Sequence, residues 1–168
     1  WVGQYMMALT NGNYVVHSPL WNNGAATQAG AVTWCSGTLG CTGAVSSTNS
    51  LVGSTTNDQV GLYGITPLSN SNYVMRGSSW DNGAATDVGA VTWCSGTLGC
   101  TGIVTTTNSV LGEAVGGGFS MTFVFDSVNS QLIVARPADN RVTLFKLDPP
   151  APNIASFTPA NNLMGRSV

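Results

Sequence analysis

Apolar and polar residues alternate in short runs along most of the chain, and turn-forming residues bound each run. Residues 2–9 and 13–19 are two such runs, and the Asn-Gly pair between them is a strong signal for a tight hairpin. Further runs follow at 30–35 and 41–47, so the pattern predicts four short antiparallel strands. No segment keeps a period of 3.6 residues, and we therefore expect an all-β fold with almost no helix.

The same pattern returns in a second unit. The stretch NGAATQAGAVTWCSGTLGCTG at 23–43 recurs at 82–102 as NGAATDVGAVTWCSGTLGCTG, and a shorter third unit has strand-like runs at 119–125, 131–137 and 141–146. A fixed period of this length is typical of repeat proteins, in which neighbouring units bury one another's apolar faces. The sequence thus predicts tandem four-stranded antiparallel blades, with boundaries at 1–58 and 59–117 for two repeats and 118–147 for an abbreviated third.

The last segment, 148–168, differs in composition. It begins with DPPAP, which favours an extended, semi-rigid linker, and continues into one strand-like run that contains Ile154 and Phe157. A single strand is not stable alone. We therefore expect this extended strand to pair with a neighbouring domain or subunit, with Ile154 and Phe157 filling pockets in the acceptor.

Composition excludes several classes of function. Charged residues make up 7% of the chain, against about 25% in a typical soluble domain. The net charge is −2 without a basic cluster, so we expect no binding to nucleic acid or to anionic lipid. No apolar run reaches the roughly 20 residues of a membrane span, so membrane insertion is not expected either. Ser, Thr, Asn and Gly take the place of the charges, as on many exported proteins.

The four cysteines form two pairs at the same place in each unit, Cys35 with Cys41 and Cys94 with Cys100. Each pair flanks a Gly-containing turn, which brings the two Cα atoms within bridging distance and favours a disulfide inside each unit. A zinc site and free buried thiols are the alternatives. Disulfides predict an extracellular or cell-surface location.

The blade pattern resembles a known family. Units with an Asn-Tyr-Val-Val-x-Ser-Pro strand, an Asn/Asp-rich loop and Gly-Ala-Val-Thr-Trp resemble the blades of FG-GAP-type β-propellers in bacterial exported proteins, over about residues 2–147. The run from Asn153 resembles the first strand of an immunoglobulin-like domain of the IPT/TIG sort. Two and a half blades cannot close a ring. The resemblance therefore implies blades that are stacked or part of a larger propeller, in a chain that is a segment of a larger assembly.

Metal and catalytic chemistry have little support in the residues. Propellers of the FG-GAP family carry calcium loops with several aspartates, but here the corresponding loop has carboxylates only in the second unit, at Asp81 and Asp87. Calcium requires six or more oxygen ligands, so we expect no metal and no other cofactor. The single histidine, His17, has no counterpart in the second unit, and no nucleophile recurs beside it. We expect no catalytic residues and no enzyme activity.

Two functions remain from different classes. The first is a structural component of an extracellular fibre or cell-surface stalk, built from disulfide-stapled β units that bind copies of themselves or adjacent repeats and are joined by strand addition. The alternative is a lectin-like module of a surface adhesin, because an exposed Trp flanked by amides is suited to bind a glycan. Its expected glycan contacts are Trp21, Asn22 and Asn23 in the first unit and Trp80, Asp81 and Asn82 in the second.

Overall fold

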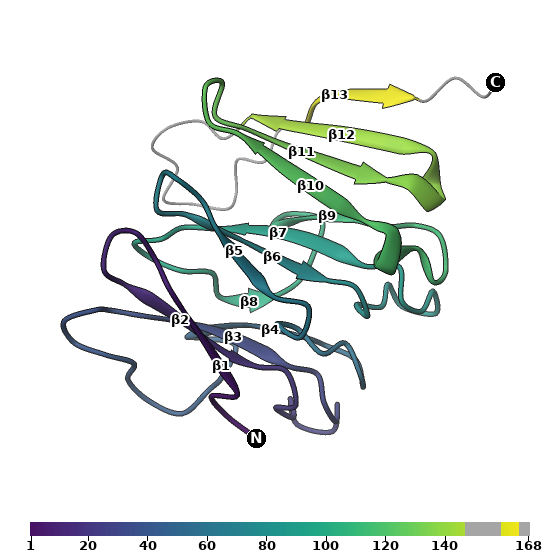
Figure 1. Ribbon diagram of the computed structural model, residues 1–168. Coiled ribbons are helices and arrows are strands. Elements are labelled where there is room, and N and C mark those ends of the chain that lie inside the picture. The colour runs from purple at the N-terminus through teal and green to yellow at the C-terminus, as the bar shows by residue number, and fades with distance from the viewer. Residues whose placement is uncertain (147–158, 165–168) are drawn as a thin grey trace.

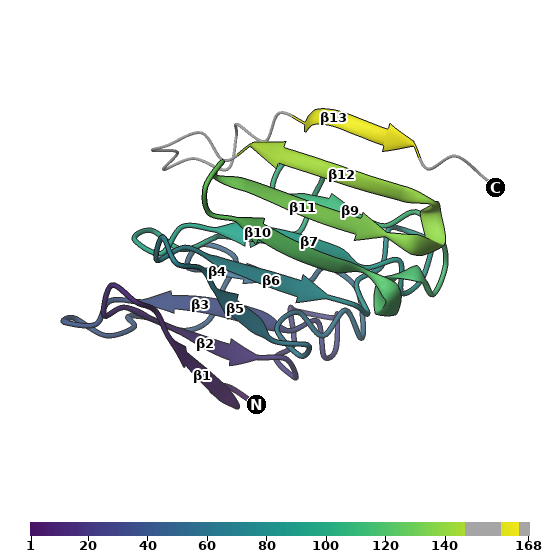
Figure 2. The same cartoon turned by 45° about the horizontal axis from the view of Figure 1, so that its top comes forward.

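Three small β-sheets are stacked in chain order in the computed structural model (Figures 1 and 2). The structure describes residues 1–146 and 159–164. Within these residues it is all-β and built as a tandem repeat, which confirms the predicted fold class, and its sheets do not close into a barrel or a propeller ring. The only helical segments described there are two 3-10 turns, η1 (Gly117–Ser120) and η2 (Pro137–Asp139).

The first sheet contains a strand from the second repeat. Its order is β1-β2-β3-β4-β8, and its first four strands are antiparallel neighbours. The fifth strand, β8, comes from the second repeat and pairs in parallel with β4, so the first repeat's sheet is completed by its successor. The strand bounds are β1 (Tyr5–Ala8), β2 (Tyr14–Ser18), β3 (Ala31–Cys35), β4 (Ser50–Val52) and β8 (Gly102–Ile103).

The other two sheets have four strands each and contain only antiparallel pairs. The second sheet consists of β5 (Ile65–Pro67), β6 (Tyr73–Gly77), β7 (Ala90–Cys94) and β9 (Ser109–Leu111), in that order. The third consists of β10 (Thr122–Asp126), β11 (Gln131–Arg136), β12 (Arg141–Lys146) and β13 (Pro159–Met164). The third sheet carries no disulfide.

The expected fourth strand at 41–47 is not a strand in the structure, and β4 lies a few residues later. The side chain of Asn49 explains the difference. Its Nδ2 donates to the carbonyl oxygen of Ala44 at 2.9 Å, and its Oδ1 accepts from the backbone N–H of Ser46 at 3.0 Å. These local bonds compete with sheet pairing. The fully buried Ser50–Val52 segment forms the strand instead.

The C-terminal segment also differs from its expectation in the part that is described. Residues 159–164 were expected to pair with a neighbouring domain or subunit, but they lie antiparallel to β12 of the same chain. Without them, β12 would leave a row of backbone donors and acceptors open at the sheet edge, and the strand nearest in sequence satisfies it. Ile154 and Phe157 lie outside the described residues.

Two apolar cores separate the three sheets, and both are built from the same positions. The core between the first and second sheets takes its first-repeat residues from Leu9, Val15, Val32 and Leu51, with Trp34 packed against it. The core between the second and third sheets takes their counterparts 59 positions later, Leu68, Val74, Val91, Trp93 and Val110. Each repeat thus covers the face of the next one.

Candidate functional site: the junction between repeats

A short run of backbone hydrogen bonds holds the chain at the boundary between the first and second repeats against the loop of the first repeat. The N–H of Asn57 donates to the Thr27 carbonyl at 3.0 Å, and the N–H of Gln59 donates to the Gln28 carbonyl at 3.1 Å. At the next junction, the N–H of Gly116 donates to the Thr86 carbonyl at 3.0 Å, and Gly118 donates to Asp87 at 2.9 Å. All four donors and acceptors keep the spacing of 59 positions. We call this set of bonds the backbone clasp.

A buried carbonyl reinforces the first junction. The oxygen of Gly96, in the cysteine loop of the second repeat, accepts three hydrogen bonds from the first repeat. The donors are Asn11 Nδ2 at 2.8 Å, Asn13 Nδ2 at 2.9 Å and the indole Nε1 of Trp34 at 2.9 Å. The Asn-Gly hairpin and the Trp-Cys strand are therefore both fixed by the next repeat. The sequence predicted the hairpin, but not that the side-chain amides of Asn11 and Asn13 also bind the next repeat.

Each disulfide lies within one repeat, Cys35–Cys41 in the first and Cys94–Cys100 in the second. The Cα atoms are 4.6 Å and 5.2 Å apart, because the strand before each loop and the residues after it are brought together by the tight Ser-to-Gly turn. Cys100 is buried at the junction, whereas Cys41 is exposed. Two disulfides and no free cysteine among the described residues indicate an oxidising environment.

The loop tryptophans are less accessible than their sequence context indicates. Trp80 is 4% exposed and belongs to the core between the first and second sheets, so a stacked sugar would not reach it. Trp21, its first-repeat counterpart, is half-buried. The structure therefore speaks against Trp80 as a glycan contact. The difference arises because the first repeat covers Trp80 and no described residue covers Trp21 in the same way.

The Asn and Asp side chains next to these tryptophans stabilise their own loops by hydrogen bonds to the backbone. Asn22 Oδ1 accepts from the backbone N–H of Gln28 at 2.8 Å, and Asp81 Oδ1 accepts from Asp87 at 2.7 Å in the second repeat. Asn23 Nδ2 donates to the Gly53 carbonyl at 2.9 Å. Asn82 is exposed. Asp81 thus accepts the same backbone hydrogen bond in the second repeat that the Asn22 side chain accepts in the first. In the part of the chain that the structure describes, no three His, Cys, Asp or Glu side chains gather as a metal site.

Asp58 joins the first repeat to the second through its buried carboxylate. It is fully buried, and its carboxylate accepts from the N–H groups of Ser54 and Thr55 and from that of Asp81 in the next repeat, at 2.7, 2.9 and 3.1 Å. The second repeat has Gly117 at the equivalent position, so no repeated aspartate marked the site. There, Asp139 of the third repeat accepts from the matching N–H groups.

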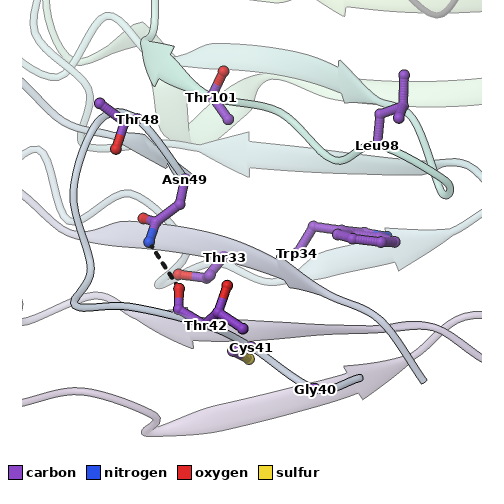
Figure 3. Close-up of a pocket in the computed structure, with 9 residues that line it drawn as sticks. All are labelled: Thr33, Trp34, Gly40, Cys41, Thr42, Thr48, Asn49, Leu98 and Thr101. Carbon is purple, nitrogen blue, oxygen red and sulfur yellow. Dashed lines mark hydrogen bonds between the residues drawn. The ribbon is translucent and has the colours of Figure 1, made fainter. Parts of the chain in front are cut away.

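A pocket of about 250 Å³ opens beside the first junction (Figure 3). The first repeat contributes Thr33, Trp34, Gly40, Cys41, Thr42, Thr48 and Asn49 to its lining, and the second contributes Leu98 and Thr101. Asn49 is held in place by its bond to the Thr42 carbonyl at 3.4 Å. The lining combines one indole with several threonine hydroxyls, which the sequence did not bring together because they come from both repeats.

His17 is buried beside the same junction. Its Nδ1 lies 3.3 Å from the Gly61 carbonyl oxygen of the second repeat, and its ring makes an edge contact with Tyr5. Burial lowers the pKa of His17 below its ordinary value, and the bond to Gly61 opposes this shift. Burial therefore favours the neutral form of the His17 imidazole.

No helix among the described residues has the length and apolar character needed to cross a membrane.

Comparison with known proteins identifies the repeat. Residues 8–62 and 67–118 match the model of a family described as a repeat of unknown function (DUF5650). That match supports neither the FG-GAP nor the IPT/TIG resemblance. A search of curated proteins found no match. The two matched segments contain the two disulfide-closed units and together span more than half of the sequence, so the chain belongs to the family of DUF5650 repeats.

Proposed function

We propose that the chain is a structural segment of an extracellular fibre or cell-surface stalk, and that it has no enzymatic activity. The observation that carries this proposal is the backbone clasp, which recurs with the same geometry at two successive repeat boundaries. In it, Gln59 of the second repeat donates to Gln28 of the first, and Gly118 of the third donates to Asp87 of the second. Because the clasp uses main-chain groups, it recurs wherever the backbone repeats, independent of most side chains. Stacked units of this kind have nearest-neighbour interfaces only, and such arrays extend without limit by adding units.

The disulfides and the surface chemistry support an extracellular site of action. A disulfide in each of the first two repeats closes a small loop at the edge of the stack and restrains the unfolded chain. The surface is poor in charge and rich in hydroxyl and amide groups, which matches a protein that remains packed against copies of itself. Both features suit a component that has to persist outside the cell.

Strand exchange would join one subunit to the next. In the single chain, residues 159–164 occupy the edge of β12 in an antiparallel register. The same register between two chains would give identical backbone hydrogen bonds, so exchange has a low enthalpic cost and produces a directional contact. Copies of this chain are the partners that this joint predicts.

Electron microscopy of the native material tests the structural role. We expect filaments or stalks from the full chain, and loss of the filaments from a chain that ends at Leu147, with the circular dichroism spectrum of the sheets retained. Filaments from the truncated chain would place the joint elsewhere. Absence of any filament or surface stalk in the native material would refute the structural role.

The pocket beside Trp34 favours the lectin-like alternative as a second candidate. An indole flanked by threonine hydroxyls offers an apolar surface to sugar C–H groups and donors and acceptors to sugar hydroxyls. Trp21 with Asn22 remains a second place for such a contact, because it is only half-buried.

A glycan array separates this alternative from the structural role. If the chain is a lectin, Thr42→Val and Thr48→Val together should weaken glycan binding about thirtyfold, because each removes a hydroxyl worth roughly 1 kcal/mol. Trp21→Ala is the control for the loop site. An array on which the intact protein binds no glycan would exclude the lectin-like function.

A further inference from the structure

We propose that the outer face of the first sheet is a docking surface for another repeat of the same family, which stacks on it as the first repeat stacks on the second. This outer face is the side of β1, β2 and β3 that points away from the second sheet (Figure 2). The inference rests on the stacking in the proposed function and names the partner of that stack.

The second repeat shows what this face looks like when it is covered. Tyr73 and Met75 of β6 point toward the first repeat and have no exposed surface. Ile65, which pairs with Met75, is 5% exposed. These side chains pack against the face of the first sheet that points toward the second sheet. Val15, Val32 and Trp34 supply that face. The contact buries a continuous apolar layer.

The first repeat presents the same apolar layer without a cover. Met6 pairs with Val16 in the register in which Ile65 pairs with Met75, yet Met6 is 72% exposed. Cys41 is exposed, whereas Cys100 is buried. Four further positions are half-buried in the first repeat and buried in the second: Tyr14 and Tyr73, Val16 and Met75, Trp21 and Trp80, and Val45 and Val104.

A polar acceptor marks the register of the missing partner. Gly37 is the counterpart of Gly96. Its backbone N–H donates to Asn13 Oδ1 at 3.0 Å, just as the N–H of Gly96 donates to Asn72 Oδ1 at 2.9 Å. The Gly96 carbonyl is buried under three donors from the preceding repeat. Gly37 is exposed, and no donor in residues 1–146 or 159–164 reaches its carbonyl oxygen.

These observations specify one occupant. A repeat that carries two turn asparagines and a strand tryptophan, as Asn11, Asn13 and Trp34 do, would place three donors on the Gly37 carbonyl and an apolar face on Met6 and Val16. The docked repeat would form the same interface that the first repeat already forms with the second. The geometry of the contact therefore follows from the existing one. A generic apolar partner would leave the Gly37 carbonyl without these donors.

A chain extended by one repeat tests the proposal. A second copy of residues 2–59 is placed directly before Val2, so that its last residue is followed by Val-Gly as Gln59 is in the natural sequence. The copy carries Met6→Leu and Met7→Leu, which leaves the original Met6 as the reporter. Peroxide oxidation of Met6 is measured by peptide mapping, with the buried Met75 as the internal standard. We expect the oxidation rate of Met6 to fall about tenfold in the extended chain, because sulfoxide formation follows exposure.

The control is the same extended chain with Asn11→Ala and Trp34→Ala in the copy only. It removes two of the three donors and the ring, and should restore at least half of the oxidation rate of Met6. The proposal is overturned if Met6 is oxidised at the original rate in a folded, monomeric extended chain, or if the copy stays unfolded in front of a folded chain. It is also overturned if the original chain is a dimer that already protects Met6. None of these outcomes depends on fibres, so failure of the proposed fibre is seen separately.

Discussion

Replacing Tyr73 by Ala is expected to lower the free energy of unfolding by about 4 kcal/mol, whereas Tyr14→Ala is expected to lower it by about 1 kcal/mol. The two tyrosines stand at the same position of successive repeats, opposite Cys94 and Cys35 in their strand pairs. Tyr73 is completely buried between two sheets, and Tyr14 is half-buried on the outer face. Truncation of Tyr73 therefore leaves a cavity, and truncation of Tyr14 leaves a depression that water fills.

Urea unfolding of both variants under one set of conditions measures the difference. Tyr73→Phe is the matched control, because it keeps the ring, and it should cost less than about 1.5 kcal/mol. Equal destabilisation by Tyr73→Ala and Tyr14→Ala would mean that stacking of the first two repeats contributes little to stability. The result would then contradict the repeat interface as the main source of stability.

Removing the disulfide of the second repeat with Cys94→Ala and Cys100→Ala is expected to cost about 3 kcal/mol, and the same change at Cys35 and Cys41 about 2 kcal/mol. The two loops have the same length, with a sequence separation of 6, so their effects on the entropy of the unfolded chain are equal. Removal of the second pair also costs packing energy, because Cys94 and Cys100 are almost without exposed surface.

Thermal and urea unfolding of the two double variants checks this order, with dithiothreitol-treated native protein as a third sample that lacks both bonds. The reduced native protein should lose about the sum of the two effects, because the bonds lie in different repeats. In the first pair only Cys41 is exposed, whereas both cysteines of the second pair are buried. A larger effect of the first pair than of the second would contradict the expected order, since chain entropy alone treats the two loops alike.

The strands at the start of each unit were predictable because each depends on its own sequence. The Asn-Gly hairpin and the alternating Val15, Val32 and Trp34 positions are local signals that survive in the structure as β1, β2 and β3. A tandem duplication also indicated that these units stack. The repeat family confirms the duplication, and the structure confirms the all-β fold.

The remainder depends on contacts between units, which a local pattern does not contain. The burial of Trp80 comes from the preceding repeat, and the parallel pairing of β8 with β4 joins residues about 50 positions apart. The run at 41–47 alternates as a strand does, but Asn49 binds its backbone from outside the run. The role of Asp58 has no local sequence signal, because its hydrogen-bond partners lie in two different loops.

The pairing of β8 with β4 imposes an order on folding during synthesis. Gly102 and Ile103 complete the first sheet, but they emerge long after Leu51 and Val52, with which they pair. The edge of β4 therefore stays open until most of the second repeat has appeared, and an open edge is where a nascent chain associates wrongly with its neighbours. A pause in synthesis before Gly102 would leave the first sheet unfinished, whereas a pause after Ile103 would leave it closed.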